Sequence, residues 1–368
     1  MADRLPLSEQ AGPHLRRTAR LDPTATPPQP GQGLTMRTGR DGSFSLWSES
    51  FQEGFHSGRG AVREARETFL QPSELQRFSP GSTLRVLEVC VGTGCNLAVL
   101  LEACASRGLH LDWTGLELDP EPLRLALAQP HFRAPWQPQT LRILEQLQTA
   151  GAWSIKAGGE VATASQTAAS NARATGSDAD RSAQKRSEPV QSSSCGRMLW
   201  GDARQMLQQR RRQKSAAFDL IWHDAFSPQR CPQLWTLEFL GDLTRLLGPE
   251  GRWISYCSAA AVREALRLTG LQLVALPSAR NSANPPQAWS GGTVASPSAL
   301  PASPLWRALS PMELEHLASS AAEPYRDPTG AATAEAILSA RQQAQAEALA
   351  CGTRSSSSAW RRRWRLEG

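Results

Sequence analysis

The chain has 368 residues, enough for one large domain with a well-buried core, and it carries a formal net charge of +6 at pH 7. It contains no apolar stretch long enough to span a bilayer, and its first residues lack the apolar core of a secretion signal, so we expect neither a membrane protein nor an exported one. Its seven cysteines lack paired Cys-x-x-Cys spacing, which indicates reduced thiols in a cytoplasmic protein rather than disulfides or a metal site.

Composition separates three segments from the rest of the chain. Residues 1–37 are rich in Pro, Thr and Gly and predict a flexible leader. Residues 150–196 hold mostly Ala, Ser, Thr and Gly, with few large apolar side chains, which predicts a disordered insertion on the surface. Residues 331–368 predict a helix-prone and basic tail. We therefore expect one domain at 38–330, interrupted by the insertion.

Within this domain, strand patterns and helix patterns alternate along the chain. Apolar and β-branched runs predict strands near 84–90, 112–117, 197–200, 218–223, 252–257, 271–276 and 292–295. Apolar residues at helical spacing predict helices near 59–69, 95–106, 120–128, 139–148, 203–210, 234–247 and 259–269. A tight turn is expected at 248–251, before the fifth strand. This alternation predicts an α/β fold, with a mostly parallel sheet and helices on both of its faces.

The first predicted strand leads into a glycine turn. Gly92 and Gly94 flank Thr93, and a helical pattern starts near Asn96. Glycines let the backbone approach a ligand closely and adopt positive φ. The next strand ends in Glu117, and an acid at that point of such a fold holds the ribose hydroxyls of a nucleoside cofactor.

Two cofactors compete for this turn. A dinucleotide needs a third glycine where this chain has Leu97. S-adenosylmethionine sites favour an acid on the strand before the turn, which is Glu88 here, and Asp202 after the third strand is placed to accept a hydrogen bond from the adenine amino group. Three acids after three strands favour S-adenosylmethionine over NAD.

A further carboxylate follows the fourth strand. The apolar run 218–222 ends on His223 and Asp224, and Pro228 stops the strand from continuing. Open α/β sheets bind ligands outside the carboxyl ends of their strands, so Asp224 is the candidate catalytic residue. His223 is more typical of a packing residue than of a base.

Several motifs, in this order along the chain, carry a resemblance. They are DGS at 41–43, SESFQEGFHSGRGAVREARETFL at 48–70, VGTGCN at 91–96, LELDP at 116–120, WGDARQML at 200–207, FDLIWHDAFSPQRCPQLWT at 218–236, WSGGTVAS at 289–296 and AAEPYRDP at 321–328. Together they resemble the methyltransferase domain of the tRNA 5-methylaminomethyl-2-thiouridine biosynthesis protein (the MnmC-like family), in the stand-alone form without the FAD oxidase domain. The chain departs from the family at Cys90 and Ala225, where the family has glycine.

The resemblance implies a Rossmann-like class I S-adenosylmethionine-dependent methyltransferase with a seven-stranded sheet, whose last strand is antiparallel. It implies a cofactor site at Glu88, Gly92, Gly94, Asn96, Glu117 and Asp202, with His56, Phe226 and Pro228 next to the substrate. Asp224 is expected to bind and orient the substrate amine, because methyl transfer to nitrogen is an in-line displacement that depends on positioning. Asp224 is also placed to take the proton of the amine.

The activity implied is methylation of the exocyclic amine of 5-aminomethyl-(2-thio)uridine at the wobble position of tRNA. A separate enzyme is then expected to supply the aminomethyl-uridine precursor, and we expect a monomer. The basic runs at 210–214 and 360–365 favour an RNA partner, although a solvated helix end or a tail explains each of them equally well.

Three other functions remain open at this point. They are an NAD-dependent oxidoreductase on the same sheet, an aminopropyl transferase of the spermidine-synthase type, and an RNA-binding module without a cofactor. The third is suggested by Cys90 alone, since its side chain lies near the expected cofactor.

Overall fold

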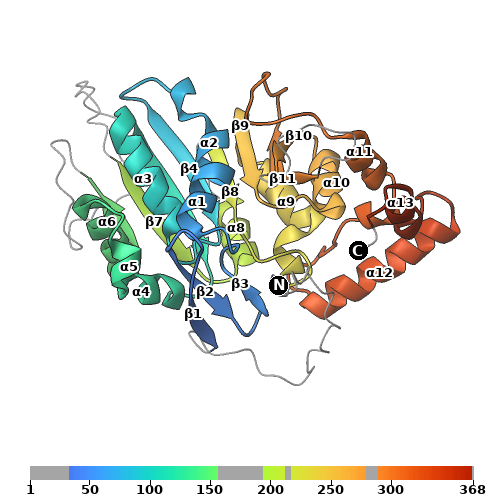
Figure 1. The fold of residues 1–368 in the computed structure, drawn as a ribbon, viewed down its shortest axis with the longest axis horizontal. Coiled ribbons are helices and arrows are strands. Elements are labelled where there is room, and N and C mark those ends of the chain that lie inside the picture. Colours follow the sequence, from blue (N-terminus) through green and yellow to red (C-terminus); the bar gives the residue numbers. More distant parts are fainter. Residues whose placement is uncertain (1–32, 156–193, 212–216, 279–288, 367–368) are drawn as a thin grey trace, which may run out of the picture.

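The computed structural model describes residues 33–155, 194–211, 217–278 and 289–366. At its centre is an eight-stranded sheet (Figure 1). From one edge to the other, the strands are β10 (Gln272–Pro277), β11 (Ser290–Ser296), β9 (Leu247–Ser255), β8 (Phe218–His223), β4 (Thr83–Val89), β5 (His110–Glu117), β7 (Cys195–Trp200) and β6 (Ala152–Ser154). The five strands from β9 to β7 are parallel, and β11 runs antiparallel to both β9 and β10. The expected mostly parallel sheet, with an antiparallel seventh strand, is confirmed.

The expected count of seven strands omits β6, which pairs antiparallel with β7 at the sheet edge. Gly151, at φ +67°, ends the preceding helix and turns the chain back along the sheet. Trp153 is buried there. A three-residue strand is too short to show a period of two, and it lies inside the range assigned to the insertion. The residues 156–193 of that predicted insertion lie outside the described part of the chain.

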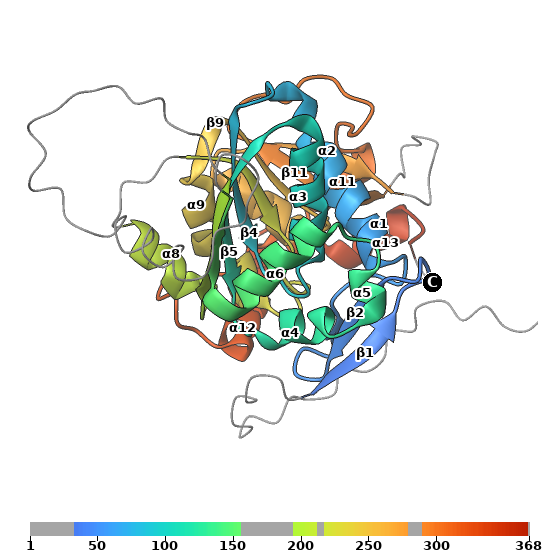
Figure 2. The ribbon, with the colours of Figure 1, turned by 90° about the vertical axis from the view of Figure 1, so that its left-hand side faces the viewer.

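Helices cover both faces of the sheet, as the alternation predicts (Figures 1 and 2). The core on one face is formed by α1 (Ala61–Glu64), the π-helix η1 (Ala65–Leu70), α2 (Gln71–Ser73), η2 (Leu75–Arg77), α3 (Cys95–Arg107), α4 (Glu121–Leu127), α5 (Pro130–Arg133) and α6 (Pro138–Ala150). The core on the other face is formed by α8 (Ala203–Arg211), η3 (Pro232–Trp235), α9 (Leu237–Thr244) and α10 (Ala260–Leu268). The strands between the two cores read as nearly continuous apolar runs because both of their faces are buried.

The residues 248–251 do not form a separate turn before the fifth strand. They lie within β9, where the pairing with β8 jumps from Phe218–Leu247 to Leu220–Arg252. A Cβ atom at Gly251 would lie 2.8 Å from the carbonyl oxygen of Phe218, so glycine is required where the extra residues bulge out. The residues 248–251, whose composition predicts a turn, therefore form a bulge within β9.

The domain begins earlier than residue 38. Three short strands, β1 (Leu34–Thr38), β2 (Phe44–Ser48) and β3 (Glu53–Gly54), form a small antiparallel sheet that sequence patterns did not predict. β1 is mostly exposed, so it lacks the alternation of a half-buried strand. Residues 1–32 of the predicted leader lie outside the described part of the chain.

The segment after residue 330, predicted as a helix-prone and basic tail, is helical and packs against the domain. It forms α12 (Ala334–Ala350) and α13 (Ser357–Arg363), next to α11 (Pro311–Leu317) and η4 (Ser320–Ala322). Ile337 and Trp360 are buried, and the Trp360 indole donates a hydrogen bond to the Met312 carbonyl oxygen at 2.9 Å. Trp360 is followed by three arginines in the sequence, so its burial could not be predicted from the local composition. No helix among the described residues is both long and apolar enough to cross a membrane.

Candidate active site

A cavity of about 570 Å³ lies at the carboxyl ends of the central strands, within the usual size of a small-molecule site. Its walls come from the loops after β4, β5, β8 and β9 and from the N-terminal segment 34–64. They include Cys90–Thr93, Glu117–Asp119, Asp224–Phe226, Tyr256, Leu34, Ser48, 50–51, 53–57 and Glu64. The small N-terminal sheet therefore closes over the sheet edge where the sequence predicts the site.

The turn after β4 is built for close approach. Gly92 and Gly94 have φ of +56° and +79°, so both occupy the left-handed region. Added Cβ atoms would lie 3.1 Å from the ring of Phe55 at Gly92 and 3.0 Å from Leu123 at Gly94. Gly92 lines the cavity, whereas Gly94 precedes α3 and is not among the lining residues.

Glu117 holds this turn from the end of β5. Its Oε2 accepts a hydrogen bond from the Gly92 N–H at 2.8 Å, and its Oε1 accepts from the N–H groups of Leu118 and Asp119 at 2.7 and 3.1 Å. Burial raises the pKa of Glu117, and these backbone donors oppose the rise. The carboxylate lines the cavity and keeps lone pairs for a ligand hydroxyl.

Asp224 lies in the cavity wall at the end of β8, and its N–H donates to the Val89 carbonyl oxygen at 3.0 Å. Asn96 donates from Nδ2 to Oδ2 of Asp224 at 2.8 Å. Asn96 is buried and is not among the lining residues, so in this structure it orients Asp224. Burial raises the pKa of Asp224 to about 8, and the charge of Glu64 adds to the rise.

Glu88 lies behind the glycine turn rather than in the cavity wall. It is fully buried, and its Oε2 accepts a hydrogen bond from the Trp113 indole at 2.9 Å. Burial raises the pKa of Glu88 to about 8, and the charges of Asp224 and Glu117 act in the same direction. A direct contact with a cofactor, as the sequence predicts, is not supported by this position.

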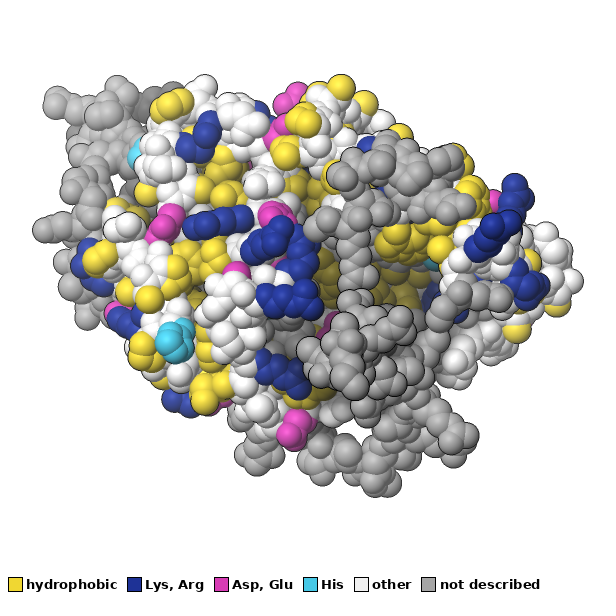
Figure 3. All heavy atoms as spheres, in the orientation of Figure 1, with side chains coloured by type: hydrophobic (Ala, Val, Ile, Leu, Met, Phe, Trp, Pro, Cys, Tyr) yellow, Lys and Arg dark blue, Asp and Glu magenta, His cyan; other side chains and the backbone are white. Residues whose placement is uncertain are grey.

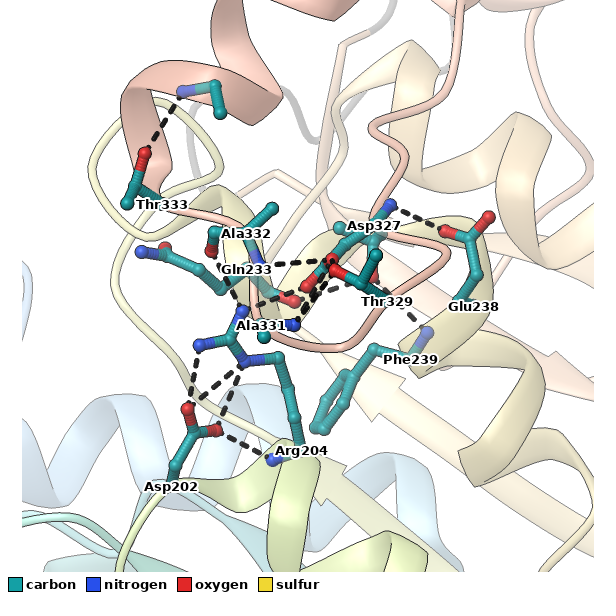
Figure 4. A network of polar contacts seen from close by, with 12 residues as sticks. Asp202, Arg204, Gln233, Glu238, Phe239, Asp327, Thr329, Ala331, Ala332 and Thr333 are labelled. Atoms are coloured by element: carbon teal, nitrogen blue, oxygen red, sulfur yellow. Dashed lines mark hydrogen bonds and ion pairs between the residues drawn. The ribbon is translucent and has the colours of Figure 1, made fainter.

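Asp202 is also absent from the cavity wall. It forms an ion pair with Arg204 at 2.7 Å, and Arg204 reaches Asp327 at 2.8 Å on the segment that leads to α12 (Figure 4). Figure 4 shows Arg204 held between Asp202 and the loop of Asp327. Asp202 therefore anchors the C-terminal segment, and the predicted adenine contact is not supported by its position.

The loop after β8 is bound to the N-terminal segment. Phe226 stacks on Phe51 with ring centroids 4.5 Å apart, and Phe55 meets it edge-on at 5.1 Å. Glu53 accepts hydrogen bonds from the N–H and hydroxyl of Ser227 at 3.0 and 2.7 Å. Phe226 lines the cavity, whereas Pro228, two residues further on, does not.

The two histidines of interest differ in environment. His56 lines the cavity, and its Nδ1 lies 3.1 Å from the Ser45 hydroxyl. Burial lowers the pKa of His56, while the charges of Glu64 and Asp41 oppose this. His223 is fully buried, stacks on Trp235 with centroids 4.2 Å apart, and has its pKa lowered by burial to about 3. His223 is a packing residue in this structure, as its sequence context indicates.

The wall of the cavity is acidic. Five carboxylates line it, namely Glu53, Glu64, Glu117, Asp119 and Asp224, and among the described residues no lysine or arginine does. The sequence analysis did not predict three residues of the wall, Glu53, Glu64 and Tyr256. The hydroxyl of Tyr256 donates a hydrogen bond to the Ala225 carbonyl oxygen at 2.8 Å. Glu53 and Glu64 lie in the motif at 48–70, and the family resemblance of this motif was the feature of the sequence that could have pointed to them. Such a wall favours a positively charged ligand.

The two departures from the family differ in their backbone. Cys90 has φ of +66°, which a residue with a Cβ atom rarely adopts. Its N–H donates to the Leu116 carbonyl oxygen at 2.9 Å, so the pairing of two strands holds this conformation in place. Ala225 is not among the residues with positive φ, so an alanine is accommodated there without that strain.

We expect Cys90→Gly to stabilise the protein. Removing the Cβ atom from a residue in the left-handed conformation stabilises the folded state by about 1–2 kcal/mol. The glycine also makes the unfolded chain more flexible, which offsets about 0.5–1 kcal/mol of this gain. The free energy of unfolding, measured by denaturant titration, should therefore rise by about 0.5–1 kcal/mol. An unchanged or lower value would show that the thiol contributes packing that outweighs the strain.

Comparison with known proteins agrees with the geometry. Residues 179–282 match a family described as S-adenosyl-L-methionine-dependent methyltransferase. The chain is 26% identical over 236 residues to the bifunctional tRNA 5-methylaminomethyl-2-thiouridine biosynthesis protein MnmC of Chromobacterium violaceum, covering 61% of this chain and 30% of that protein. It is 27% identical over 226 residues to an uncharacterized protein of Methanocaldococcus jannaschii, covering 61% of this chain and 51% of the other. The chain thus spans 30% and 51% of the length of these two relatives.

The crystal structure of MNMC2 from Aquifex aeolicus has the same fold, with a TM-score of 0.62, 24% identity, and coverage of 86% of this chain and 85% of that one. The structure match shows a Rossmann-like fold, and the family match over residues 179–282 supports a methyltransferase with S-adenosylmethionine as its cofactor. The expected resemblance is confirmed as well: this methyltransferase is related to the MnmC proteins. These matches favour S-adenosylmethionine over the nicotinamide alternative.

Proposed function

We propose that this protein methylates the exocyclic amine of 5-aminomethyl-(2-thio)uridine at the wobble position of tRNA. The observation that carries the proposal is the acidic cavity around Asp224, with five carboxylates and, among the described residues, no lysine or arginine in its wall. Such a wall fits a substrate that enters as an ammonium ion. The name of the MnmC relatives, tRNA 5-methylaminomethyl-2-thiouridine biosynthesis protein, refers to the methylated product of this reaction.

The residues present fit the cofactor. The cavity has the volume of a nucleoside-sized site, Gly92 leaves room where a Cβ atom would approach Phe55, and Glu117 offers carboxylate oxygens for ribose hydroxyls. When bound, S-adenosylmethionine supplies a methyl group on a positively charged sulfonium. The acidic wall suits this charge as well. Gly92 and Glu117 are thus the residues that would hold it, with Asn96 acting through Asp224.

Asp224 is the residue that we assign to the substrate amine. Asn96 occupies its Oδ2, which leaves Oδ1 to receive an N–H of the amine. An ionised carboxylate of ordinary pKa would stabilise the ammonium form and resist its deprotonation. Burial raises the pKa of Asp224 to about 8, which brings it closer to that of an alkyl amine. A bound ammonium favours the ionised form of Asp224, and proton transfer from the amine to this carboxylate is then less uphill than to an aspartate of ordinary pKa.

The N-terminal segment also carries a basic outer surface that suits RNA phosphates. Four exposed arginines lie on β1, on the adjoining loop, on α1 and on η1, namely Arg37, Arg40, Arg63 and Arg66. In Figure 3, arginine side chains gather over the region where Figure 1 places α1. The basic run at 360–365 lies in and just after α13, which is well to the right of β1 and α1 in Figure 1. Side chains of the other predicted run, at 210–214, lie outside the described part.

We expect the double variant Arg40→Ala/Arg66→Ala to raise the KM for tRNA by roughly tenfold at moderate salt, with little change in kcat, because phosphate contacts supply affinity rather than chemistry. Steady-state kinetics at two salt concentrations measures this. Arg361→Ala/Arg362→Ala on α13 is the matched control and should leave KM unchanged. A larger effect of the α13 variant would place the RNA at α13 instead.

The proposed function is tested by incubating the protein with S-adenosylmethionine and tRNA that carries 5-aminomethyl-uridine, followed by mass spectrometry of the nucleosides. We expect the wobble nucleoside to gain one methyl group. tRNA with the carboxymethylaminomethyl form should remain unmodified, because a separate enzyme supplies the free amine. A parallel reaction with decarboxylated S-adenosylmethionine and a diamine tests aminopropyl transfer; product in that reaction alone would replace the proposal.

A further inference from the structure

Glu64 is one of the cavity carboxylates that sequence patterns did not single out. It ends α1, lines the same cavity as Asp224, and among the described residues accepts one hydrogen bond, from the Ser57 N–H at 2.9 Å. The other wall carboxylates have structural duties: Glu117 holds three backbone N–H groups and Glu53 holds Ser227. Glu64 therefore makes fewer hydrogen bonds that hold the fold than Glu117 and Glu53 do.

The segment before α1 is shaped to hold this helix in place. The Ser43 hydroxyl accepts from the Ala61 N–H at 2.7 Å, and Asp41 accepts from the Arg63 N–H at 3.3 Å, so both side chains cap the first turn. Gly60 has φ of +113°, and a Cβ atom there would lie 1.9 Å from the Asp41 carboxylate. The DGS motif at 41–43 and Gly60 thus fix the position of Glu64.

The other end of α1 is fixed as well. The chain continues into the π-helix η1, a wide turn that is rare and is found frequently at functional sites. Phe69 in η1 is fully buried and packs on Trp222 of β8 with ring centroids 5.7 Å apart. Glu64 and Asp224 are therefore held on elements that pack against each other.

Two carboxylates facing one cavity repel each other unless a cation or a proton lies between them. Both groups line one cavity, and the charge of Glu64 contributes to the raised pKa of Asp224. Among the described residues, no arginine or lysine lines the wall to offset this cost. An arrangement that is unfavourable without a ligand and favourable with a cation is typical of a cation-binding site.

We propose that Glu64 and Asp224 together form the subsite for the substrate ammonium, in which Glu64 selects a charged amine over a neutral group. The inference rests on the proposed function and adds a second positioning residue to it. In the proton step, an N–H bond of the ammonium breaks, an O–H bond forms on Asp224, and the nitrogen keeps the electron pair. Glu64 stays ionised and holds the remaining N–H.

The test is calorimetric titration of protein saturated with S-adenosylhomocysteine, using 5-aminomethyluridine and its neutral analogue 5-hydroxymethyluridine. Wild-type protein should bind the amine at least roughly tenfold more tightly than the alcohol. Glu64→Gln should lose most of this preference and keep its affinity for S-adenosylhomocysteine, while Glu64→Asp should recover part of it. Glu67→Gln removes a carboxylate from the same helical segment, outside the cavity, and should behave as wild type.

The outcomes separate the two proposals. An unchanged preference in Glu64→Gln overturns the role of Glu64 and leaves the proposed function standing. The absence of any amine preference in wild-type protein overturns both. If Glu64→Gln no longer binds S-adenosylhomocysteine, Glu64→Asp decides: it must weaken amine binding more than cofactor binding, and equal losses overturn the inference.

Discussion

Replacement of Asp224 by asparagine is expected to lower the rate of methylation by roughly 10²-fold or more, while S-adenosylmethionine binds almost as tightly as before. Asparagine has nearly the same shape and can still accept the hydrogen bond that Asn96 donates to Asp224 at 2.8 Å. It cannot take a proton from the amine, and it presents no charge to an ammonium. Single-turnover kinetics measures the first effect, and calorimetric titration measures the second.

Asn96→Ala is the informative companion variant, because Asn96 is buried behind Asp224 and does not line the cavity. Loss of its hydrogen bond should lower the rate less than Asp224→Asn does, since the carboxylate remains but is less well oriented. An equal loss of cofactor affinity in Asp224→Asn and in a cofactor-site variant would contradict the assignment, because Asp224 would then be a structural or cofactor residue.

Replacement of Glu117 by alanine is expected to weaken S-adenosylmethionine binding by roughly 10²-fold or more. The variant removes the acceptor for three backbone N–H groups, among them that of Gly92 in the turn. A fully buried donor left without a partner costs about 1–3 kcal/mol; the hydrogen bonds of the Gly92 and Asp119 N–H groups are part-buried and that of Leu118 is exposed, so we expect the main loss from the Gly92 turn and from the oxygens offered to the ribose. Calorimetric titration measures the affinity, and thermal unfolding without cofactor measures the cost to the fold.

Glu117→Gln separates these two effects. Its amide oxygen can replace one carboxylate oxygen as an acceptor, but its amide nitrogen faces N–H donors, so we expect affinity between those of wild type and alanine. If Glu117→Ala unfolds at the wild-type temperature and binds the cofactor normally, the acid at the end of β5 has neither of the roles assigned to it here.

Local patterns were sufficient to predict the sheet and the glycine turn. The strands β4, β5 and β8 are largely apolar runs buried on both faces; Glu117 is the last residue of β5, and Asp224 directly follows β8. Because parallel strands end at one edge of the sheet, their acids come together without further information. For the same reason, the cavity lies where sequence reasoning placed the site.

Contacts between distant segments could not be predicted in this way. Asp202 follows β7 as expected, but its carboxylate is taken by Arg204, which in turn is paired with Asp327 far along the chain. Glu64 reaches the cavity only because Asp41, Ser43 and Gly60 fold the N-terminal segment over the sheet edge. The periodic pattern of a single strand or helix predicts neither the pairing of Asp202 with Arg204 nor the position of Glu64 in the cavity wall.

The most direct measurement is a crystal structure of the protein with S-adenosylhomocysteine and 5-aminomethyluridine bound together. We predict that both occupy the acidic cavity, with the amine nitrogen within about 3 Å of carboxylate oxygens of Asp224 and Glu64. A nucleoside bound outside this cavity, or one whose amine points away from both carboxylates, would contradict the central claim that this acidic wall recognises the amine to be methylated.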